Sequence, residues 1–288
     1  MEFSLIAKLV LPLSLALMML TLGLNLRLDD FRQIIEKPKA FVIGLSLQLL
    51  LLPLVVWLNV GIVNLSFTLP SLVAAGFIVL AACPGGATSN AIAHLAGGNA
   101  ALSISLTAVI SMLMPLVLPI SLSWQLNLWQ HSVDDIMIPV IPTVTKLLLI
   151  TVLPVILGMV LKAKMPLQIK KHQGKIQRLA YGLFFMLVLF MLWRFWEDML
   201  KSGVLVIVMS LSICSLAMLS AWFVSKQAGL TIASQRTLMV ETGIQNAATG
   251  MFIATSVLAK PELALIPLTY GIVMNLPAII VIVINKYR

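Results

Sequence analysis

The chain has 288 residues, of which 60% are hydrophobic and only 10% are charged, and its mean hydropathy is +1.07. Ordinary soluble domains carry about a quarter charged residues, so the composition excludes a typical soluble domain. Its formal net charge of +9 is concentrated in short connections between apolar runs, which is a feature of membrane topology rather than of nucleic-acid binding. The runs are continuously apolar and lack the alternation of a transmembrane barrel strand. The sequence therefore predicts an all-α polytopic membrane protein.

In chain order, nine segments are apolar and long enough to cross a bilayer. They are residues 5–24, 40–60, 70–98, 101–123, 137–161, 178–196, 203–225, 234–259 and 263–285. If all nine cross, the basic connections 25–39 and 162–177 fall on the same side of the membrane as the C-terminus. The positive-inside rule then predicts a multi-pass protein of the cell (inner or plasma) membrane, with its N-terminus outside and its C-terminus in the cytoplasm.

The third and eighth segments are interrupted near their centres. The third contains PGG at 84–86, and the eighth contains VETGIQNAATG at 240–250. Proline removes a backbone donor and paired glycines loosen the helix, and unwound backbone at membrane depth needs cover from protein or a polar cavity. A proline kink without function would explain PGG alone. Polar residues beside both breaks favour a substrate site where the two broken helices meet.

Glu241 is the one acidic residue of ten that lies deep inside a predicted span. A carboxylate at the bilayer centre costs about 2.5–3.5 kcal/mol unless it is neutralised. A pair with Lys146 in the fifth segment is a competing explanation, but a bound cation is preferred. The polar groups near the breaks are oxygen donors, namely Thr88, Ser89, Asn90, Gln245 and Asn246, with Ser103, Thr107 and Gln48 in neighbouring segments. Hard oxygen ligands of low charge favour sodium, with a proton on Glu241 as the rival.

The two breaks lie five segments apart, so copies related by that offset enter the membrane in opposite directions. This predicts an inverted-topology repeat within a single domain of residues 1–288, with a first repeat at 1–123 that lacks its opening helix and a second at 137–288. Half-helices beginning near Ser89 and Asn246 would present positive ends to a shared midplane site. Residue chemistry alone therefore predicts a cation-coupled secondary transporter of an organic anion.

CPGGATSN, followed by GGNAALSISLT and later by ETGIQNA, resembles the motifs of the bile acid:sodium symporter family, over essentially the whole chain. The resemblance implies two inverted repeats of crossed, broken helices. It places core helices at about 40–123 and 203–285 and panel helices at about 5–24 and 137–196, in a nine-span version of the fold. It also implies symport with two sodium ions by alternating access. The family's substrates range from bile acids to small carboxylates.

Site residues follow from the resemblance by motif. One sodium site would use Ser89, Asn90, Ser103, Thr107 and Glu241. The other would use Gln48, Glu241 and Gln245, with main-chain carbonyls near Thr242 and Ile244. Substrate contacts are implied at Thr88, Asn246 and Asn275. Family members often carry Thr directly after the two glycines, where this chain has Ala87; the change leaves the sodium ligands intact and bears on the substrate contact.

Other functions remain open on sequence grounds. A proton-coupled or uncoupled carrier or exporter would share the broken-helix fold. An intramembrane enzyme with Glu241 as general acid or base would lack a partner nucleophile or metal cluster, so no enzyme is expected. A sensor that binds the anion would lack a signalling domain. The expected partners are a small organic anion and the lipid bilayer, with no nucleic acid and no obligate protein partner.

Overall fold

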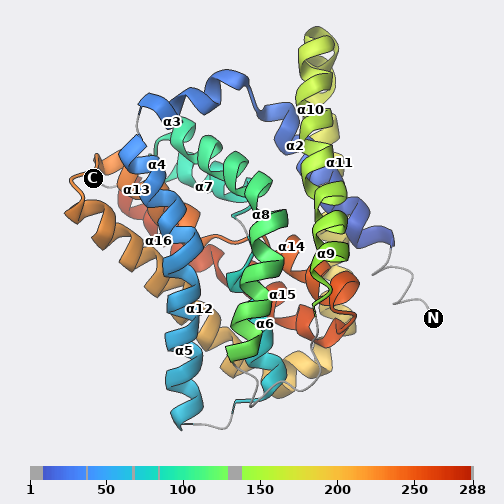
Figure 1. Cartoon of the computed structure of the whole chain (residues 1–288), viewed down its shortest axis with the longest axis vertical. Helices are drawn as coiled ribbons and strands as arrows, with labels where there is room; N and C mark the ends of the chain where they lie inside the picture. The colour runs from blue at the N-terminus through green and yellow to red at the C-terminus, as the bar shows by residue number, and fades with distance from the viewer. Residues whose placement is uncertain (1–8, 37, 67–68, 84, 129–137, 287–288) are drawn as a thin grey trace.

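The computed structural model describes residues 9–36, 38–66, 69–83, 85–128 and 138–286. Every regular element within these ranges is a helix, and the only extended pairing among them is an isolated bridge of two residues. The helices pack into a bundle, from whose upper end in Figure 1 α10 and α11 project. The predicted all-α class is therefore confirmed.

Six helical stretches of the described chain are long and apolar enough to cross a membrane by length and composition. They are α4 (Pro38–Ser46) continued by η3 (Leu47–Leu51) and α5 (Leu52–Ser66); α8 (Ala100–Leu128); α9 (Val140–Leu147) continued by η4 (Leu148–Val152) and α10 (Leu153–Lys164); α11 (Pro166–Arg194); α12 (Trp196–Gln227); and η6 (Pro261–Ala264) continued by α15 (Leu265–Val273) and α16 (Asn275–Lys286). A seventh is obtained if α2 (Leu11–Asn25) is joined to the helical turns η2 (Leu28–Phe31) and α3 (Arg32–Glu36), from which it is bent by 81°.

These six stretches correspond to six of the nine predicted segments. The first predicted segment contains α2, and the third and eighth are pairs of shorter helices. The third consists of α6 (Ser71–Ala81) and α7 (Ala87–Leu95); the eighth consists of α13 (Ile232–Gly243) and α14 (Ala247–Phe252), continued by the π-helical turn η5 (Ile253–Val257). Both predicted interruptions are thus present, whereas the full count of nine spans stays a prediction.

Helix boundaries differ most around the basic connection predicted at 162–177. There α11 begins at Pro166 rather than at 178, because proline fits the first helical turn, where its missing N–H is not needed. Lys170, Lys171 and Lys175 therefore lie on an exposed helical extension. Similarly, α12 begins at Trp196 rather than at 203.

The interrupted helices are the most buried part of the bundle. Every residue from Val240 to Thr255 is buried, as is every residue from Val73 to Cys83. The outer helices instead expose apolar side chains, such as Phe185 and Met186 of α11, which suits contact with lipid. Other helices therefore cover the two breaks, as interrupted backbone at membrane depth requires.

Candidate cation and substrate site

The two breaks cross, and their extended backbones pair. Gly85 and Gln245 form an isolated antiparallel bridge, flanked by extended conformations at Gly86 and Ile244. A Cβ atom on Gly85 would lie 3.3 Å from Glu241 Oε2 and 3.6 Å from the Ile244 carbonyl oxygen. Glycine at this position therefore permits the close approach of the two chains, and four helix ends converge on one point.

Two of these ends are helix N-termini. Helix α7 starts immediately after the first break, and α14 starts after the second with Asn246 as its cap. The Asn246 side-chain oxygen accepts a hydrogen bond of 3.1 Å from the Thr249 backbone N–H. Free N–H groups and the aligned peptide dipoles give such ends a partial positive charge, which favours an anionic group beside the crossing.

The carboxylate of Glu241, fully buried in the last turn of α13, is surrounded by hydroxyl groups. It accepts hydrogen bonds from Ser89 Oγ at 2.9 Å, Ser103 Oγ at 2.5 Å and Thr107 Oγ1 at 2.9 Å. The amide oxygen of Asn90 lies 2.7 Å from Ser103 Oγ and 3.1 Å from Thr107 Oγ1. The five residues expected at the first sodium site therefore lie together, contributed by α7, α8 and α13.

This oxygen cluster is short of protons. Each of the three hydroxyls lies within hydrogen-bond distance of two acceptors, since Ser89 Oγ is also 2.6 Å from the Gly86 carbonyl oxygen. A hydroxyl carries one hydrogen and two acceptor lone pairs, so three hydrogens serve six contacts. The remaining lone pairs and the carboxylate charge fit a small hard cation bound by oxygen.

Two amides expected at the second sodium site have unpartnered oxygens. Gln48, in the π-helical turn η3, is buried and close enough to interact with Glu241, yet neither its amide nitrogen nor its amide oxygen has a hydrogen-bond partner of good geometry. Gln245 donates to the Thr242 carbonyl at 2.8 Å, and its own amide oxygen has no partner. Buried oxygens without a partner are costly, and a cation would satisfy both.

The main-chain carbonyls expected at the second sodium site, those of Thr242 and Ile244, are not both free of hydrogen bonds. The Thr242 hydroxyl donates to the Leu238 carbonyl at 2.7 Å, so it points along its own helix. The Thr242 carbonyl already accepts from Gln245. The Ile244 carbonyl lies at the crossing, beside Gly85. The structure thus places Gln48 beside Glu241 and the Ile244 carbonyl at the crossing, and leaves only the backbone carbonyl of Thr242 as an oxygen that could face an ion.

Two adjoining cavities lie beside the crossing. One, of about 430 Å³, is lined by Gln245, Asn246, Thr88 and Asn275. The other, of about 690 Å³, shares Thr88 and Asn275. All three expected substrate contacts therefore reach a cavity, with Thr88 and Asn275 exposed and Asn246 buried. The side chain of Ala87 lies outside the described part of the chain.

Residues of α11 and α15 also line the site, and they were not predicted from the sequence. Tyr181 lines both cavities, joined by Phe184 in one and Gln177 in the other. The Tyr270 hydroxyl donates to the Gly243 carbonyl at 2.7 Å, beside the second break. The sequence feature that could have indicated Tyr270 is a tyrosine inside an apolar span, because a buried tyrosine hydroxyl needs a polar partner.

Lys146, the competing partner predicted for Glu241, lies elsewhere in the structure. Lys146 is exposed and donates to the Ser256 carbonyl at 3.1 Å, and no ion pair with Glu241 is formed among the described residues. A structural Lys146–Glu241 pair is therefore wrong as an explanation of the buried carboxylate.

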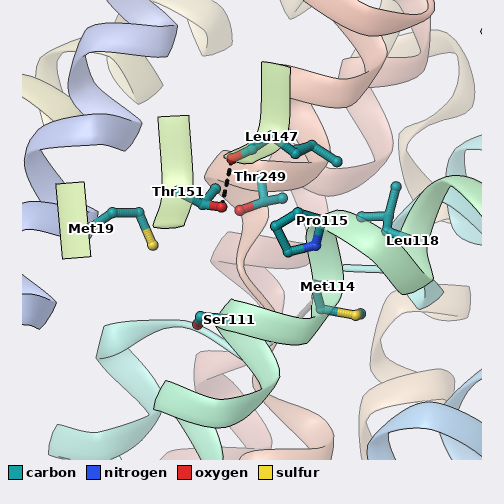
Figure 2. Close-up of a pocket in the computed structure, with 8 residues that line it drawn as sticks. All are labelled: Met19, Ser111, Met114, Pro115, Leu118, Leu147, Thr151 and Thr249. Carbon is teal, nitrogen blue, oxygen red and sulfur yellow. Dashed lines mark hydrogen bonds between the residues drawn. The ribbon is translucent and has the colours of Figure 1, made fainter. Parts of the chain in front are cut away.

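A small third cavity, of about 10 Å³, is lined by hydroxyls from three elements (Figure 2). The Thr151 hydroxyl of η4 donates to the Leu147 carbonyl at 2.7 Å, whereas the side-chain hydroxyls of Ser111 in α8 and Thr249 in α14 have no hydrogen-bond partner. A volume of this size is close to the minimum that holds one water molecule.

The sequence profile described as Sodium Bile acid symporter family matches residues 12–202. The chain belongs to this family. It is 28% identical over 246 residues to the uncharacterized sodium-dependent transporter YocS of Bacillus subtilis, covering 84% of this chain and 72% of that protein. It is 29% identical to the probable chloroplastic sodium/metabolite cotransporter BASS1 of Arabidopsis thaliana, covering 86% of this chain and 59% of that protein.

The human ileal sodium/bile acid cotransporter is also similar, with 29% identity over 84% of this chain and 68% of the relative. The sodium bile acid symporter family consists of transporters rather than enzymes, as the sequence predicts. Together with the apolar helices, this makes the chain a multi-pass membrane transporter.

Proposed function

We propose that this protein is a symporter that uses a sodium gradient to import a small organic anion. The observation that carries the proposal is the oxygen cluster around Glu241, where three hydroxyls and the Asn90 amide converge on one buried carboxylate. The names of the relatives, which describe sodium-dependent transporters and cotransporters, support the same ion.

Two sodium ions are proposed, both beside Glu241. The first would be held by Ser89, Asn90, Ser103, Thr107 and Glu241. The second would be held by the amide oxygens of Gln48 and Gln245 with backbone carbonyls of the second break, including those of Thr242 and Ile244. Each ion bridges residues from separate helices, so binding would stabilise the crossing. A proton on Glu241 would raise the number of hydrogens in the cluster from three to four, which is still fewer than the six contacts. Sodium is therefore the preferred cation.

The substrate would occupy the cavities beside the crossing. Their donors include the Asn246 amide nitrogen, which has no hydrogen-bond partner, and the Thr88 hydroxyl, whereas the Asn275 amide nitrogen already donates to the Gly271 and Ile272 carbonyls. Neutral donors and helix N-termini suit a carboxylate or another anionic group. The apolar walls supplied by Phe184 and Tyr181 suit its organic body. Coupling would follow if the substrate binds well only to the sodium-loaded crossing.

Transport would follow from motion of one helix group against another. Helix α2 packs against α10 and α11, as a panel would, whereas α13 packs against α7, α8 and α12, as a core would. We further propose the nine-span, inverted-repeat topology, with the N-terminus outside and the C-terminus in the cytoplasm. The larger cavity reaches Asn25 and Gln177, near the basic ends of α10 and α11. The conformation would therefore be open to the cytoplasm.

The proposal is tested by uptake into proteoliposomes under an inward sodium gradient, with small carboxylates and bile acids as candidate substrates. Accumulation is expected for at least one of them, and replacement of sodium by potassium or choline should abolish it. Protein-free liposomes are the control. Accumulation that is unchanged when sodium is replaced would overturn sodium coupling while leaving the transporter class intact.

A further inference from the structure

Two adjoining hollows lie where α2 ends, between α8, α10 and the start of α11. The first, of about 560 Å³, is lined by Arg27, Lys162 and Lys170, with Asp30 as its carboxylate. The second, of about 610 Å³, has mostly apolar walls. Arg27 and Lys162 line both hollows, so a cationic pocket (the first hollow) opens into an apolar groove (the second).

The cationic pocket has three cations against one carboxylate, and therefore an excess of two positive charges. Among the described residues, none of the three cations forms an ion pair. The Asp30 carboxylate accepts from the Arg27 backbone N–H at 2.7 Å. Lys162 donates to the carbonyls of Asn25 and Leu26 at 2.9 and 3.1 Å, which uses two of its three ammonium donors. Lys162 also interacts electrostatically with the Asp30 carboxylate, and the pocket as a whole offers an excess of positive charge to an anion.

The apolar groove runs from this pocket along α10. Ile156 and Val160 of α10 are 47% and 41% exposed and form one wall, with Met112 of α8 and Phe31 of η2 on the other side. Exposed apolar side chains on a membrane helix face lipid rather than water. A cationic pocket continued by an apolar groove matches the charge and polarity of a phospholipid with an anionic headgroup. Basic pockets between membrane helices are a known means of binding such headgroups.

We propose that the two hollows together bind one anionic phospholipid, with its phosphate in the cationic pocket and an acyl chain in the apolar groove. The proposed lipid site does not include the Glu241 cluster, but its cationic pocket shares Asn25 and Ile104 with the 690 Å³ cavity assigned to the substrate. A lipid bound there would contact both α8 and α10, the helices that form the two sides of the groove.

The charge half of the proposal is tested by native mass spectrometry of the purified protein with phosphatidylglycerol or phosphatidylcholine added. Phosphatidylglycerol should be retained in preference to phosphatidylcholine. Arg27→Gln and Lys170→Gln should each weaken its binding about fivefold, from about 1 kcal/mol per cation. Lys171→Gln is the matched control, because Lys171 is the next residue of α11 and does not line the pocket. Equal retention of the two lipids would refute the proposal, as would unchanged phosphatidylglycerol binding in both Arg27→Gln and Lys170→Gln.

Occupation of the apolar groove by an acyl chain is tested with a different pair of variants. Val160→Trp should fill the groove and reduce retention of phosphatidylglycerol, whereas Leu161→Trp, on the next exposed position of α10 and outside the groove, should not. Inorganic phosphate at matched concentration should displace the lipid poorly. Full displacement by inorganic phosphate, together with wild-type retention in Val160→Trp, would overturn the lipid in favour of a free-anion pocket.

Discussion

Replacing Ser103 by alanine removes one oxygen from the cluster around Glu241. Ser103 is fully buried, and its hydroxyl lies 2.5 Å from the carboxylate and 2.7 Å from Asn90 Oδ1. Contacts between a hydroxyl and a charged group contribute about 1.5–3 kcal/mol. Because the site is buried, water does not readily take the place of the lost oxygen. The dissociation constant for sodium is therefore expected to rise about tenfold to about 150-fold.

The assay is equilibrium sodium binding to purified protein, with Ser105→Ala as the matched control. Ser105 lies on the same helix and is also fully buried, but its hydroxyl contacts the Ala101 and Asp30 carbonyls and not Glu241. Sodium affinity should be unchanged in this control. Wild-type affinity in Ser103→Ala, or equal losses in both variants, would refute ligation by Ser103.

Three further substitutions test the crossing and the substrate cavity. Gly85→Ala places a methyl group 3.3 Å from the Glu241 carboxylate and should weaken sodium binding about tenfold through overpacking. Gly61→Ala is the control, because a Cβ atom there has no atom within 4 Å, and it should leave sodium binding unchanged. Equal effects of the two variants would contradict the close approach of Gly85 to Glu241. Tyr270→Phe leaves the Gly243 carbonyl without its 2.7 Å donor and should lower the free energy of unfolding by about 1–3 kcal/mol, seen in denaturation; an unchanged stability would argue against this bond. Asn246→Ala removes the cap of α14, which lowers the stability of the protein by about 0.5–2 kcal/mol. The variant should weaken substrate binding but not sodium binding. The reverse pattern would make Asn246 a sodium ligand.

The cluster of oxygen groups around Glu241 was largely predictable because its chemistry is rare in a membrane span. Glu241 stands alone among apolar residues, and Ser103 and Thr107 share a helical face because they are four residues apart. The contact between Ser89 and Glu241 joins residues 152 positions apart. That pairing followed from two breaks whose helices must cover each other, and not from any local pattern.

Other features were beyond the reach of hydropathy. An apolar run marks where a helix meets lipid, but not where its hydrogen-bond ladder ends, so the start of α11 at Pro166 was missed. The bond from Tyr270 to the Gly243 carbonyl depends on the packing of α15 against the second break. The placement of Lys146 beside the Ser256 carbonyl likewise depends on how two distant helix ends meet.

In the proposed mechanism, Glu241 binds sodium where the broken helices cross. Its most direct test is equilibrium binding of radiolabelled sodium to the wild-type protein and to Glu241→Gln, which keeps the shape of the side chain and removes its charge. A unit charge pair at 4 Å contributes about 4 kcal/mol at an effective dielectric constant of 20. We predict saturable binding by the wild type and a loss of affinity of at least about a hundredfold in the variant. Sodium binding of wild-type strength in a folded Glu241→Gln protein would contradict ligation of sodium by Glu241.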